Sequence, residues 1–266
     1  MRVLIIGAGP AGLTAAQELR QLAPAKNLDP EITIVASEPG PPYSPPAMAD
    51  HFLTGDESSL YWQGQDICER LGVKYRSGIA ARAIDPDRQS VILDDGEELK
   101  YDRLVIATGS RLYAPLEGYD LPGTYNFKSL TAARDLISHA RRGDVKNVLI
   151  VGAGFIGVEV AMLLESLGLE VTVIERSWVM PNVLDEETAG FVLDVLQSHG
   201  VNVREHTEAV RFIGSERVEG VELESGEQVF ADACVAATGV KPNVDFLAGS
   251  GLDIDWGIRV DSRMLS

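Results

Sequence analysis

The first twelve residues, MRVLIIGAGPAG, constrain the fold more than any other part of the chain. Val3 to Ile6 is a run of β-branched and leucine residues, which is typical of a short strand buried on both faces. Gly7, Gly9 and Gly12 follow it. In this pattern the first glycine makes a tight turn, the second lets a pyrophosphate approach the backbone, and the third lets the next helix pack against the strand. The stretch therefore predicts a helix N-terminus that binds the phosphates of a dinucleotide.

The sequence after the glycines agrees with this interpretation. Leu13 to Leu22 has a helical pattern, and Glu31 to Ala36 predicts the next strand. Glu38 lies at the end of that strand, where an acid binds a ribose in dinucleotide-binding folds. A glycine turn that binds nothing is the less favoured alternative. Residues 39–46 are rich in proline and predict a stiff, extended loop.

The same pattern returns in the second half of the chain. Asn147 to Val151 predicts a strand, Gly152, Gly154 and Gly157 form a second fingerprint, and the strand Val171–Glu175 ends in an acid. A later strand in each half ends in Thr-Gly, at Thr108-Gly109 and Thr238-Gly239. One fingerprint can arise by chance, but two with the same sequel indicate that a whole dinucleotide-binding unit is repeated.

The other predicted elements are shorter and are spread over both halves. The helices are Leu60–Leu71, Val158–Leu167 and Glu186–His199. The strands are Val73–Tyr75, Ile79–Ile84, Val91–Leu93, Leu99–Leu104, Leu104–Ala107, Val201–Arg204, Ala233–Ala237 and Gly257–Val260, with a β-rich run over 210–230. Residues 111–126 carry prolines and glycines with little apolar periodicity, which indicates a crossover between domains.

Charge and composition narrow the partners. Lys and Arg number 23 against 40 Asp and Glu, a net charge of -17, which argues against nucleic acid or an anionic membrane as partner. A strand directly after Met1 leaves no room for a signal peptide, and no apolar run approaches a membrane span, so we expect a cytoplasmic protein. Cys68 and Cys234 are far apart, and the histidines lack metal-ligand spacing, so we expect no metal site.

These motifs resemble the pyridine nucleotide-disulfide oxidoreductase superfamily, in particular its branch of NADH oxidases, nitrite reductase flavoproteins and rubredoxin and ferredoxin reductases. The similarity runs from Met1 to about Val260. It implies an α/β fold with two Rossmann-like domains, the second inserted in the first. By the resemblance, residues 1–115 begin the FAD-binding domain, 116–240 bind NAD(P)H, and 241–266 return to the FAD-binding domain and leave it incomplete.

The resemblance also implies site residues. For FAD these are Gly7, Gly9, Pro10, Ala11 and Gly12 at the pyrophosphate, Glu38 at the adenosine ribose, Ala81 at the adenine, and Thr108 and Gly109. For NADH they are Gly152, Gly154, Phe155, Ile156 and Gly157 at the pyrophosphate, Glu175 at the ribose, and Gly239 before the return crossing. NADPH is the less favoured nucleotide, because a carboxylate repels a 2′-phosphate, although Arg176 next to Glu175 could bind one.

The sequence departs from the family in three places. Residues 39–67 contain no cysteine where the oxidase and coenzyme A disulfide reductase members carry a redox thiol. Asp50 stands where the ferredoxin reductase members have a lysine that pairs with the glutamate corresponding to Glu159. The family's later segment over the flavin, and its interface domain, do not precede Ser266, so we expect a truncated chain or completion by another subunit.

The function that we expect is an FAD-dependent oxidoreductase that passes electrons between NADH and a redox protein or partner subunit, without a redox-active thiol. Such a protein requires alignment of two cofactors rather than a visible acid or base, and it could be an oligomer. Glu159 is the ionisable residue that we expect near the nicotinamide, although a solvated glutamate in a first helical turn is an equally good interpretation. The alternatives are an NADH oxidase or small-molecule reductase, and a non-catalytic nucleotide-binding subunit.

Overall fold

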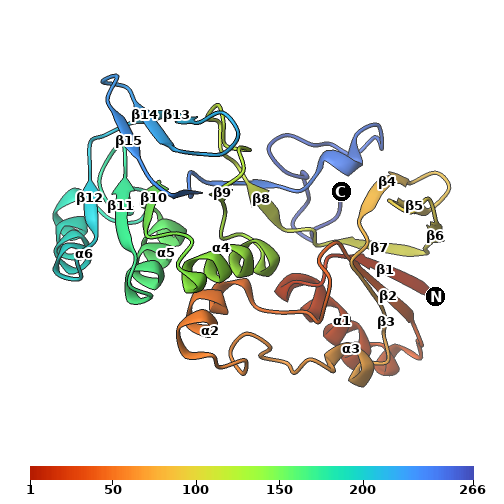
Figure 1. Ribbon diagram of the computed structural model, residues 1–266. Helices are drawn as coiled ribbons and strands as arrows, with labels where there is room; N and C mark the ends of the chain where they lie inside the picture. Colours follow the sequence, from red (N-terminus) through yellow and green to blue (C-terminus); the bar gives the residue numbers. More distant parts are fainter. The chain divides into compact units, whose positions relative to one another are not determined.

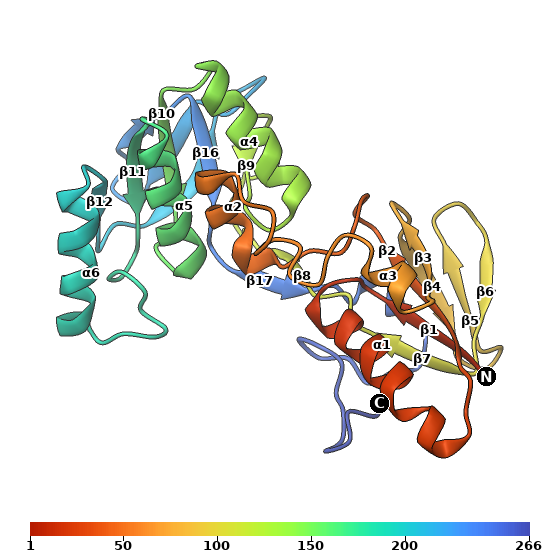
Figure 2. The same cartoon turned by 90° about the horizontal axis from the view of Figure 1, so that it is seen from below.

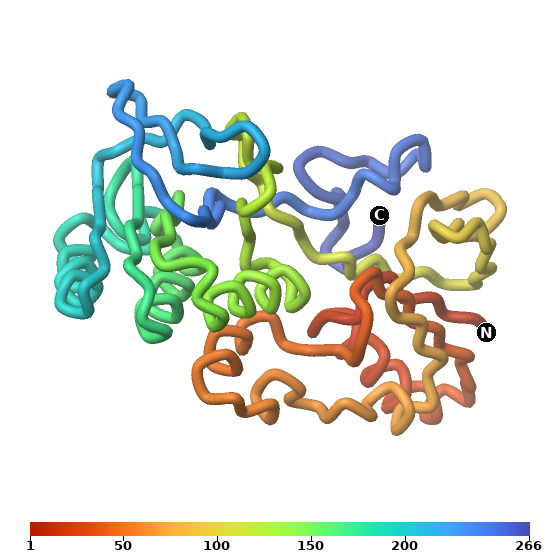
Figure 3. Tube along the Cα trace, viewed as in Figure 1, coloured from red at the N-terminus to blue at the C-terminus, as the bar shows by residue number.

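The computed structural model describes all 266 residues, Met1–Ser266, which form two compact units (Figure 1). The first unit consists of Met1–Ala47, Glu57–Arg111 and Lys241–Ser266. The second consists of Met48–Asp56 and Leu112–Val240, and it is therefore inserted in the first. Both ends of the chain belong to the first unit (Figure 3). The predicted fold class, two Rossmann-like α/β domains with the second inserted, is confirmed.

The first unit is built on a four-stranded parallel sheet of order β3-β2-β1-β7. Its strands are β1 (Arg2–Ile6), β2 (Glu31–Ala36), β3 (Lys74–Ser77) and β7 (Arg103–Ile106). Ile5 in the central strand is paired with Ile34 on one side and Val105 on the other. Because β1 has neighbours on both sides and layers on both faces, it reads as a continuous apolar run.

Different layers cover the two faces of this sheet (Figure 2). One face packs against helices α1 (Pro10–Leu22) and α3 (Ile67–Arg70), with Ile5, Leu13 and Ile34 buried between them. The other face packs against the antiparallel sheet β4-β5-β6 and the 3₁₀ turn η3 (Asp245–Leu247). The strands of that sheet are β4 (Ala81–Asp85), β5 (Ser90–Leu93) and β6 (Glu98–Lys100). The unit is thus a three-layer structure.

The second unit repeats this plan with a five-stranded parallel sheet of order β12-β11-β10-β16-β9. Its strands are β9 (Thr124–Tyr125), β10 (Asn147–Val151), β11 (Glu170–Ile174), β12 (Asn202–Arg204) and β16 (Ala233–Ala236). Its longer helices are α4 (Leu130–Arg142), α5 (Phe155–Ser166) and α6 (Glu186–Ser198). Strands β8 (Ser110–Leu112) and β17 (Val240–Pro242) lie where the chain enters and leaves the unit.

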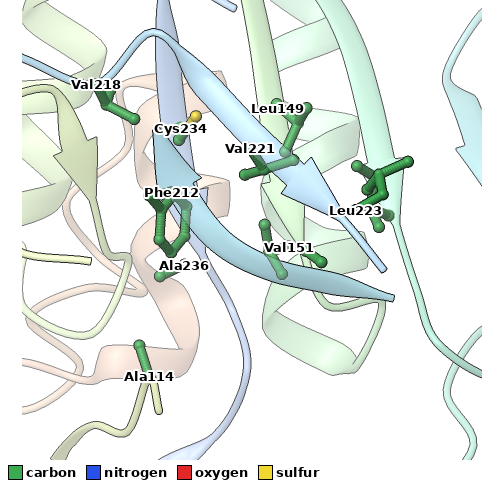
Figure 4. Close-up of a cluster of buried hydrophobic side chains, with 11 residues drawn as sticks. Ala114, Leu149, Val151, Phe212, Val218, Val221, Leu223, Cys234 and Ala236 are labelled. Atoms are coloured by element: carbon green, nitrogen blue, oxygen red, sulfur yellow. The ribbon is translucent and has the colours of Figure 1, made fainter. Parts of the chain in front are cut away.

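An antiparallel sheet covers one face of the second unit's parallel sheet (Figure 4). Its strands are β13 (Ala209–Ile213), β14 (Gly220–Leu223) and β15 (Gln228–Phe230). Phe212, Val221 and Leu223 from this layer pack with Leu149 and Val151 of β10. Side chains alternate along a strand, so Val148 and Ile150 point to the opposite face, where α5 contacts β10 and β11.

A segment from the first quarter of the sequence belongs to the second unit. Helix α2 (Met48–Thr54) lies beside α4 and α5, and its orange trace is seen against their green helices in Figure 3. The Phe52 ring contacts the Phe127 ring edge-on at 6.0 Å between centroids. Arg141 donates a hydrogen bond to the Phe52 carbonyl at 2.8 Å. The sequence interpretation had placed residues 48–56 with the first domain.

Three secondary-structure predictions were wrong, and one long helix was not predicted. The predicted helix Leu60–Leu71 is reduced to α3, because Gly64 has φ +82° and interrupts the helical path. The predicted strand Leu99–Leu104 is split between β6 and β7, which belong to different sheets. Gly257–Val260 forms only an isolated bridge between Ile254 and Ile258. Helix α4 was missed, although Ser129 caps its first turn and Gly143 ends it with φ +76°.

Candidate functional site

The loop between β1 and α1 is shaped by its three glycines. Gly7 has φ +109°, and a Cβ there would lie 2.1 Å from the carbonyl oxygen of Ala107, just after β7. A Cβ at Gly12 would lie 2.0 Å from the carbonyl oxygen of Gly7. Gly9 differs, because a Cβ there would meet no protein atom within 4 Å. The first and third glycines are therefore required by packing within the protein, whereas the second leaves open space beside the backbone.

Helix α1 begins at this open space without a side-chain cap. Gly9 is its N-cap residue, Pro10 occupies the first helical position, and the first turn contains no acidic residue. The N–H groups of Ala11 and Gly12 have no acceptor within the helix, as is general for a first turn. These donors and the positive end of the helix dipole suit an anion, so the loop fits the pyrophosphate of a dinucleotide.

The other residues predicted for FAD lie mostly at the same edge of the sheet. Glu38 follows β2, Thr108 and Gly109 follow β7, and both strands run parallel to β1, so all three ends meet at one edge. The Tyr43 hydroxyl donates to the Glu38 carboxylate, with 2.9 Å to each oxygen. Ala81 lies apart from them in sequence, at the start of β4, where the pairing with β5 is irregular.

The returning chain fixes the end of β7. The Thr108 hydroxyl donates to the Asn243 carbonyl at 2.8 Å, and the Asn243 side-chain amide donates to the Thr108 carbonyl at 2.8 Å. The Asn243 backbone N–H donates to the Gly109 carbonyl at 3.0 Å. Three hydrogen bonds between positions about 135 residues apart thus hold the Thr-Gly segment in place.

The second glycine loop repeats the geometry of the first. A Cβ at Gly152, where φ is +103°, would lie 2.5 Å from the Ala237 carbonyl oxygen, and one at Gly157 would lie 2.0 Å from the Gly152 carbonyl oxygen. A Cβ at Gly154 would again meet nothing within 4 Å. Gly154 caps α5 with φ −72° and ψ −173°, against −72° and −176° at Gly9. Both loops therefore present an uncapped helix end beside an open glycine.

A cavity of about 540 Å³ opens at the second loop, within the second unit. Several predicted residues line it, namely Gly152, Gly154, Phe155, Ile156, Glu175 and Gly239. Gly157 does not line it, which agrees with its packing against the Gly152 carbonyl. The cavity lies at the carboxyl ends of β10, β11 and β16, which is where a doubly wound sheet binds its ligand.

Glu175 is the one charged residue that is buried in the structure, with 8% of its surface exposed. One carboxylate oxygen accepts a hydrogen bond from the Ala153 N–H at 2.8 Å, and the other accepts one from the Ser177 N–H at 3.0 Å. Each oxygen retains a lone pair for a further donor. The carboxylate is thus oriented by the glycine loop and by the residue after Arg176, and it lines the cavity.

Glu159 lies one turn along α5 from Phe155 and is half-buried. Burial raises the pKa of its carboxyl group. Unlike Phe155 and Ile156, it does not line the cavity. Its side chain is half-buried rather than freely exposed, and its place near a nicotinamide stays a prediction.

Sequence reasoning missed part of the cavity wall. Asn126, Phe127 and Lys128 line it from the turn before α4, and Thr207 and Glu208 line it from the turn before β13. The first group carried a usable signal, because a helix capped by Ser129 places the preceding residues at a helix N-terminus. The second carried none, because only the return of the chain past β12 brings residues 207 and 208 to the cavity.

The whole sequence, residues 1–266, matches the pyridine nucleotide-disulphide oxidoreductase family. The chain belongs to this family. Among curated relatives, it is 34% identical to rhodocoxin reductase from Rhodococcus erythropolis, over 99% of this chain and 62% of the relative. It is 30% identical to an NADH oxidase from Methanocaldococcus jannaschii, over 99% of this chain and 60% of the relative. The chain thus spans less than two thirds of the length of these relatives.

Solved structures agree with this oxidoreductase family membership. A ferredoxin reductase from Rhodopseudomonas palustris superposes with a TM-score of 0.86 at 30% identity, covering 97% of this chain and 63% of that one. Putidaredoxin reductase, solved in a covalent complex with putidaredoxin, gives a TM-score of 0.86 at 28% identity, covering 99% of this chain and 64% of that one. The likeness extends over both units.

The two thiols of this oxidoreductase chain lie away from the residues described above. Cys68 on α3 and Cys234 on β16 are both buried and free. Burial raises the pKa of both, that of Cys234 to about 12, so both remain protonated at neutral pH. No group of three or more His, Cys, Asp or Glu side chains is placed to hold a metal ion. None of the helices is long and apolar enough to cross a membrane.

We expect electron transfer through this chain to need neither thiol. Replacing both residues in Cys68→Ala/Cys234→Ala should leave the rate of flavin reduction by NADH within about threefold of the parent, because a protonated, buried thiol is a poor nucleophile. Stopped-flow reduction under anaerobic conditions measures the rate, and thermal unfolding separates any loss of stability. A folded double variant that NADH no longer reduces would contradict this expectation.

Proposed function

We propose that this chain is the FAD- and NADH-binding part of an oxidoreductase that passes electrons between NADH and a protein partner. The observation that carries the proposal is the duplicated glycine loop. Each copy places an uncapped helix end beside a glycine where an added Cβ would meet no protein atom. At the glycines before and after it, an added Cβ would clash with backbone atoms. Two such loops in one chain suit two dinucleotides.

The first unit would hold FAD. Its pyrophosphate would lie at Gly9, Pro10, Ala11 and Gly12, and Glu38, oriented by Tyr43, would accept hydrogen bonds from the adenosine ribose. Thr108 and Gly109, held by Asn243, and the backbone of Ala81 would form further parts of this site.

The second unit would hold NADH. The 540 Å³ cavity is in the size range of small-molecule sites, and it places Gly154, Phe155 and Ile156 beside Glu175. The N–H groups at the start of α5 would bind the pyrophosphate, and the Glu175 carboxylate would bind the ribose hydroxyls. Gly239, which also lines the cavity, would form a further part of this site.

When bound, FAD supplies a ring that accepts a hydride from the nicotinamide and passes electrons on. The residues of this chain would bind and orient the two nucleotides, and no general acid or base is required of them. We retain Glu159 as the ionisable group proposed near the nicotinamide, and the burial that raises the pKa of its carboxyl group fits a position shielded from bulk water.

A protein partner is supported by the relatives. Their names include rhodocoxin reductase, ferredoxin reductase and rubredoxin-NAD(+) reductase, and a further relative is an electron transfer subunit of the assimilatory nitrate reductase of Bacillus subtilis. The strongly acidic chain, with a net charge of -17, suits a partner that presents a basic surface.

Direct reduction of oxygen is the second candidate, because a relative of similar identity is an NADH oxidase. Buried thiols with raised pKa values argue against the variant of this chemistry that uses a cysteine of this chain. A non-catalytic nucleotide-binding subunit is a third possibility, which would lack flavin reduction altogether.

One spectroscopic experiment on the full-length protein separates these functions. We expect the purified protein to show the visible absorption bands of oxidised flavin, and NADH added under anaerobic conditions should bleach them. Reoxidation should be slow in air and fast on addition of a rubredoxin or a [2Fe–2S] ferredoxin. Fast reoxidation by air alone would favour an oxidase, and a protein that binds no flavin would overturn the proposal.

A further inference from the structure

The segment between β11 and α6, residues 176–184, has no regular secondary structure (Figure 1). Arg176, Pro181 and Asn182 line the cavity from this segment, which we call loop 176–184. Met180 within it has φ +55°, an unfavourable backbone conformation for a residue other than glycine. The loop therefore needs specific contacts to keep its conformation.

Three backbone N–H groups of loop 176–184 are bound by residues outside it. The Ser177 N–H donates to Glu175, and the Met180 N–H donates to the Ala153 carbonyl at 2.8 Å. These two contacts connect the loop to the cavity itself. The third contact comes from elsewhere, because the Val179 N–H donates to the Glu205 carboxylate at 2.7 Å.

Glu205 has features of a positioning residue rather than a ligand-binding one. It follows β12 and does not line the cavity. Val179 is completely buried, at 0% exposed, so water cannot replace the carboxylate as partner of its N–H. The neighbouring His206 N–H donates to the Ser177 carbonyl at 2.9 Å, which gives the loop a second connection to the same turn.

We propose that Glu205 positions loop 176–184 and thereby shapes the part of the cavity that holds the adenosine ribose and its neighbouring phosphate. This inference rests on the proposed function, because it assumes that the cavity binds NADH. Loss of the carboxylate leaves a buried N–H without an acceptor, and the loop can satisfy that group only by moving. A moved loop would displace Arg176 and Asn182 from the cavity wall. It would also disturb the hydrogen bond that the Ser177 N–H donates to the Glu175 carboxylate.

The test uses the full-length protein and two fragments of the nucleotide. ADP-ribose contains the adenosine, both riboses and the pyrophosphate but no nicotinamide, and its binding is measured by calorimetry. Reduced nicotinamide mononucleotide contains the nicotinamide, its ribose and one phosphate but no adenosine, and its kcat/KM for flavin reduction is measured. The variants are Glu205→Ala, Glu205→Asp and Glu205→Gln, with Glu216→Ala as a control that removes an exposed carboxylate of the same unit.

We expect Glu205→Ala to weaken ADP-ribose binding about tenfold, equivalent to about 1.4 kcal/mol. Glu205→Asp keeps the charge but shortens the side chain, so it should weaken binding severalfold, and it carries the test if the alanine variant fails to fold. Glu205→Gln keeps an acceptor oxygen and should bind within about twofold of the parent, because a neutral acceptor still satisfies the N–H. The kcat/KM for reduced nicotinamide mononucleotide and the control variant should be unchanged.

Two results would overturn this inference and leave the proposed function intact. One is folded Glu205→Ala and Glu205→Asp variants that bind ADP-ribose like the parent. The other is an equal loss with reduced nicotinamide mononucleotide, which would indicate a general structural defect. If the parent itself does not bind ADP-ribose, the proposed function fails, and the inference fails with it.

Discussion

Gly154→Ala should leave the second unit folded and yet weaken NADH binding by at least about tenfold, or about 1.4 kcal/mol. A Cβ at this position meets no protein atom within 4 Å, and its φ of −72° suits any residue, so the protein alone has no reason to reject alanine. A pyrophosphate against the helix end would occupy that same open space. The effect is therefore specific to the ligand.

The matched change in the first unit is Gly9→Ala. A Cβ at Gly9 also meets no protein atom within 4 Å, and its φ is also −72°. We expect it to lower the ratio of FAD to protein after gel filtration of the full-length protein, with thermal stability in excess FAD nearly unchanged. Gly157→Ala would be a poor test, because its Cβ would lie 2.0 Å from the Gly152 carbonyl oxygen and would disturb the fold itself.

Gly190→Ala is the control for both changes. Gly190 lies in α6, where a Cβ again meets nothing within 4 Å, and it does not line the cavity. It should leave NADH and FAD binding unchanged and stabilise the protein by about 0.5–1 kcal/mol, because alanine favours a helix. If Gly154→Ala binds NADH as tightly as this control does, the glycine loop is not where the pyrophosphate lies.

The second large effect concerns the choice of nucleotide, and it depends on Glu175. The parent should have a kcat/KM for NADH well above that for NADPH, because a 2′-phosphate would lie against a buried carboxylate. Glu175→Gln should lower kcat/KM for NADH at least about tenfold. Its amide offers one acceptor oxygen where the carboxylate accepts from both the Ala153 and Ser177 N–H groups, and a buried donor left unpaired costs about 1–3 kcal/mol.

The ratio of the two kcat/KM values is the decisive quantity. Glu175→Gln removes the charge that repels the 2′-phosphate. The kcat/KM for NADPH should therefore fall less than that for NADH, and the ratio of the two should move closer to one. Arg176→Gln is the companion variant, since Arg176 lines the cavity next to Glu175. Arg176→Gln should change the kcat/KM for NADH and that for NADPH by the same factor if Arg176 does not bind the 2′-phosphate. A parent enzyme that uses NADPH as well as NADH would refute the assignment of Glu175.

The sequence by itself determined the two strand–loop–helix units. The first and third glycines of each loop are dictated by contacts within a few residues or with an adjacent strand, such as Gly12 with the Gly7 carbonyl, and a side chain does not fit at those positions. The acids Glu38 and Glu175 could also be placed at strand ends, because each lies at or just after the end of a recognisable apolar strand. Short strands of β-branched residues between two layers also carry a clear pattern, as in Val148–Val151.

Only the tertiary structure decided the contacts that depend on where the chain returns. The hydrogen bonds of Thr108 with Asn243 join positions 135 residues apart, and no local pattern specifies such a partner. The packing of Phe52 on Phe127 places residues 48–56 in the second unit, and nothing in the local sequence of this segment indicates that its apolar partner lies about 75 residues later in the chain. The hydrogen bond from the Val179 N–H to Glu205 also depends on the return of the chain. The Glu205 carboxylate reaches loop 176–184 because β12 pairs with β11.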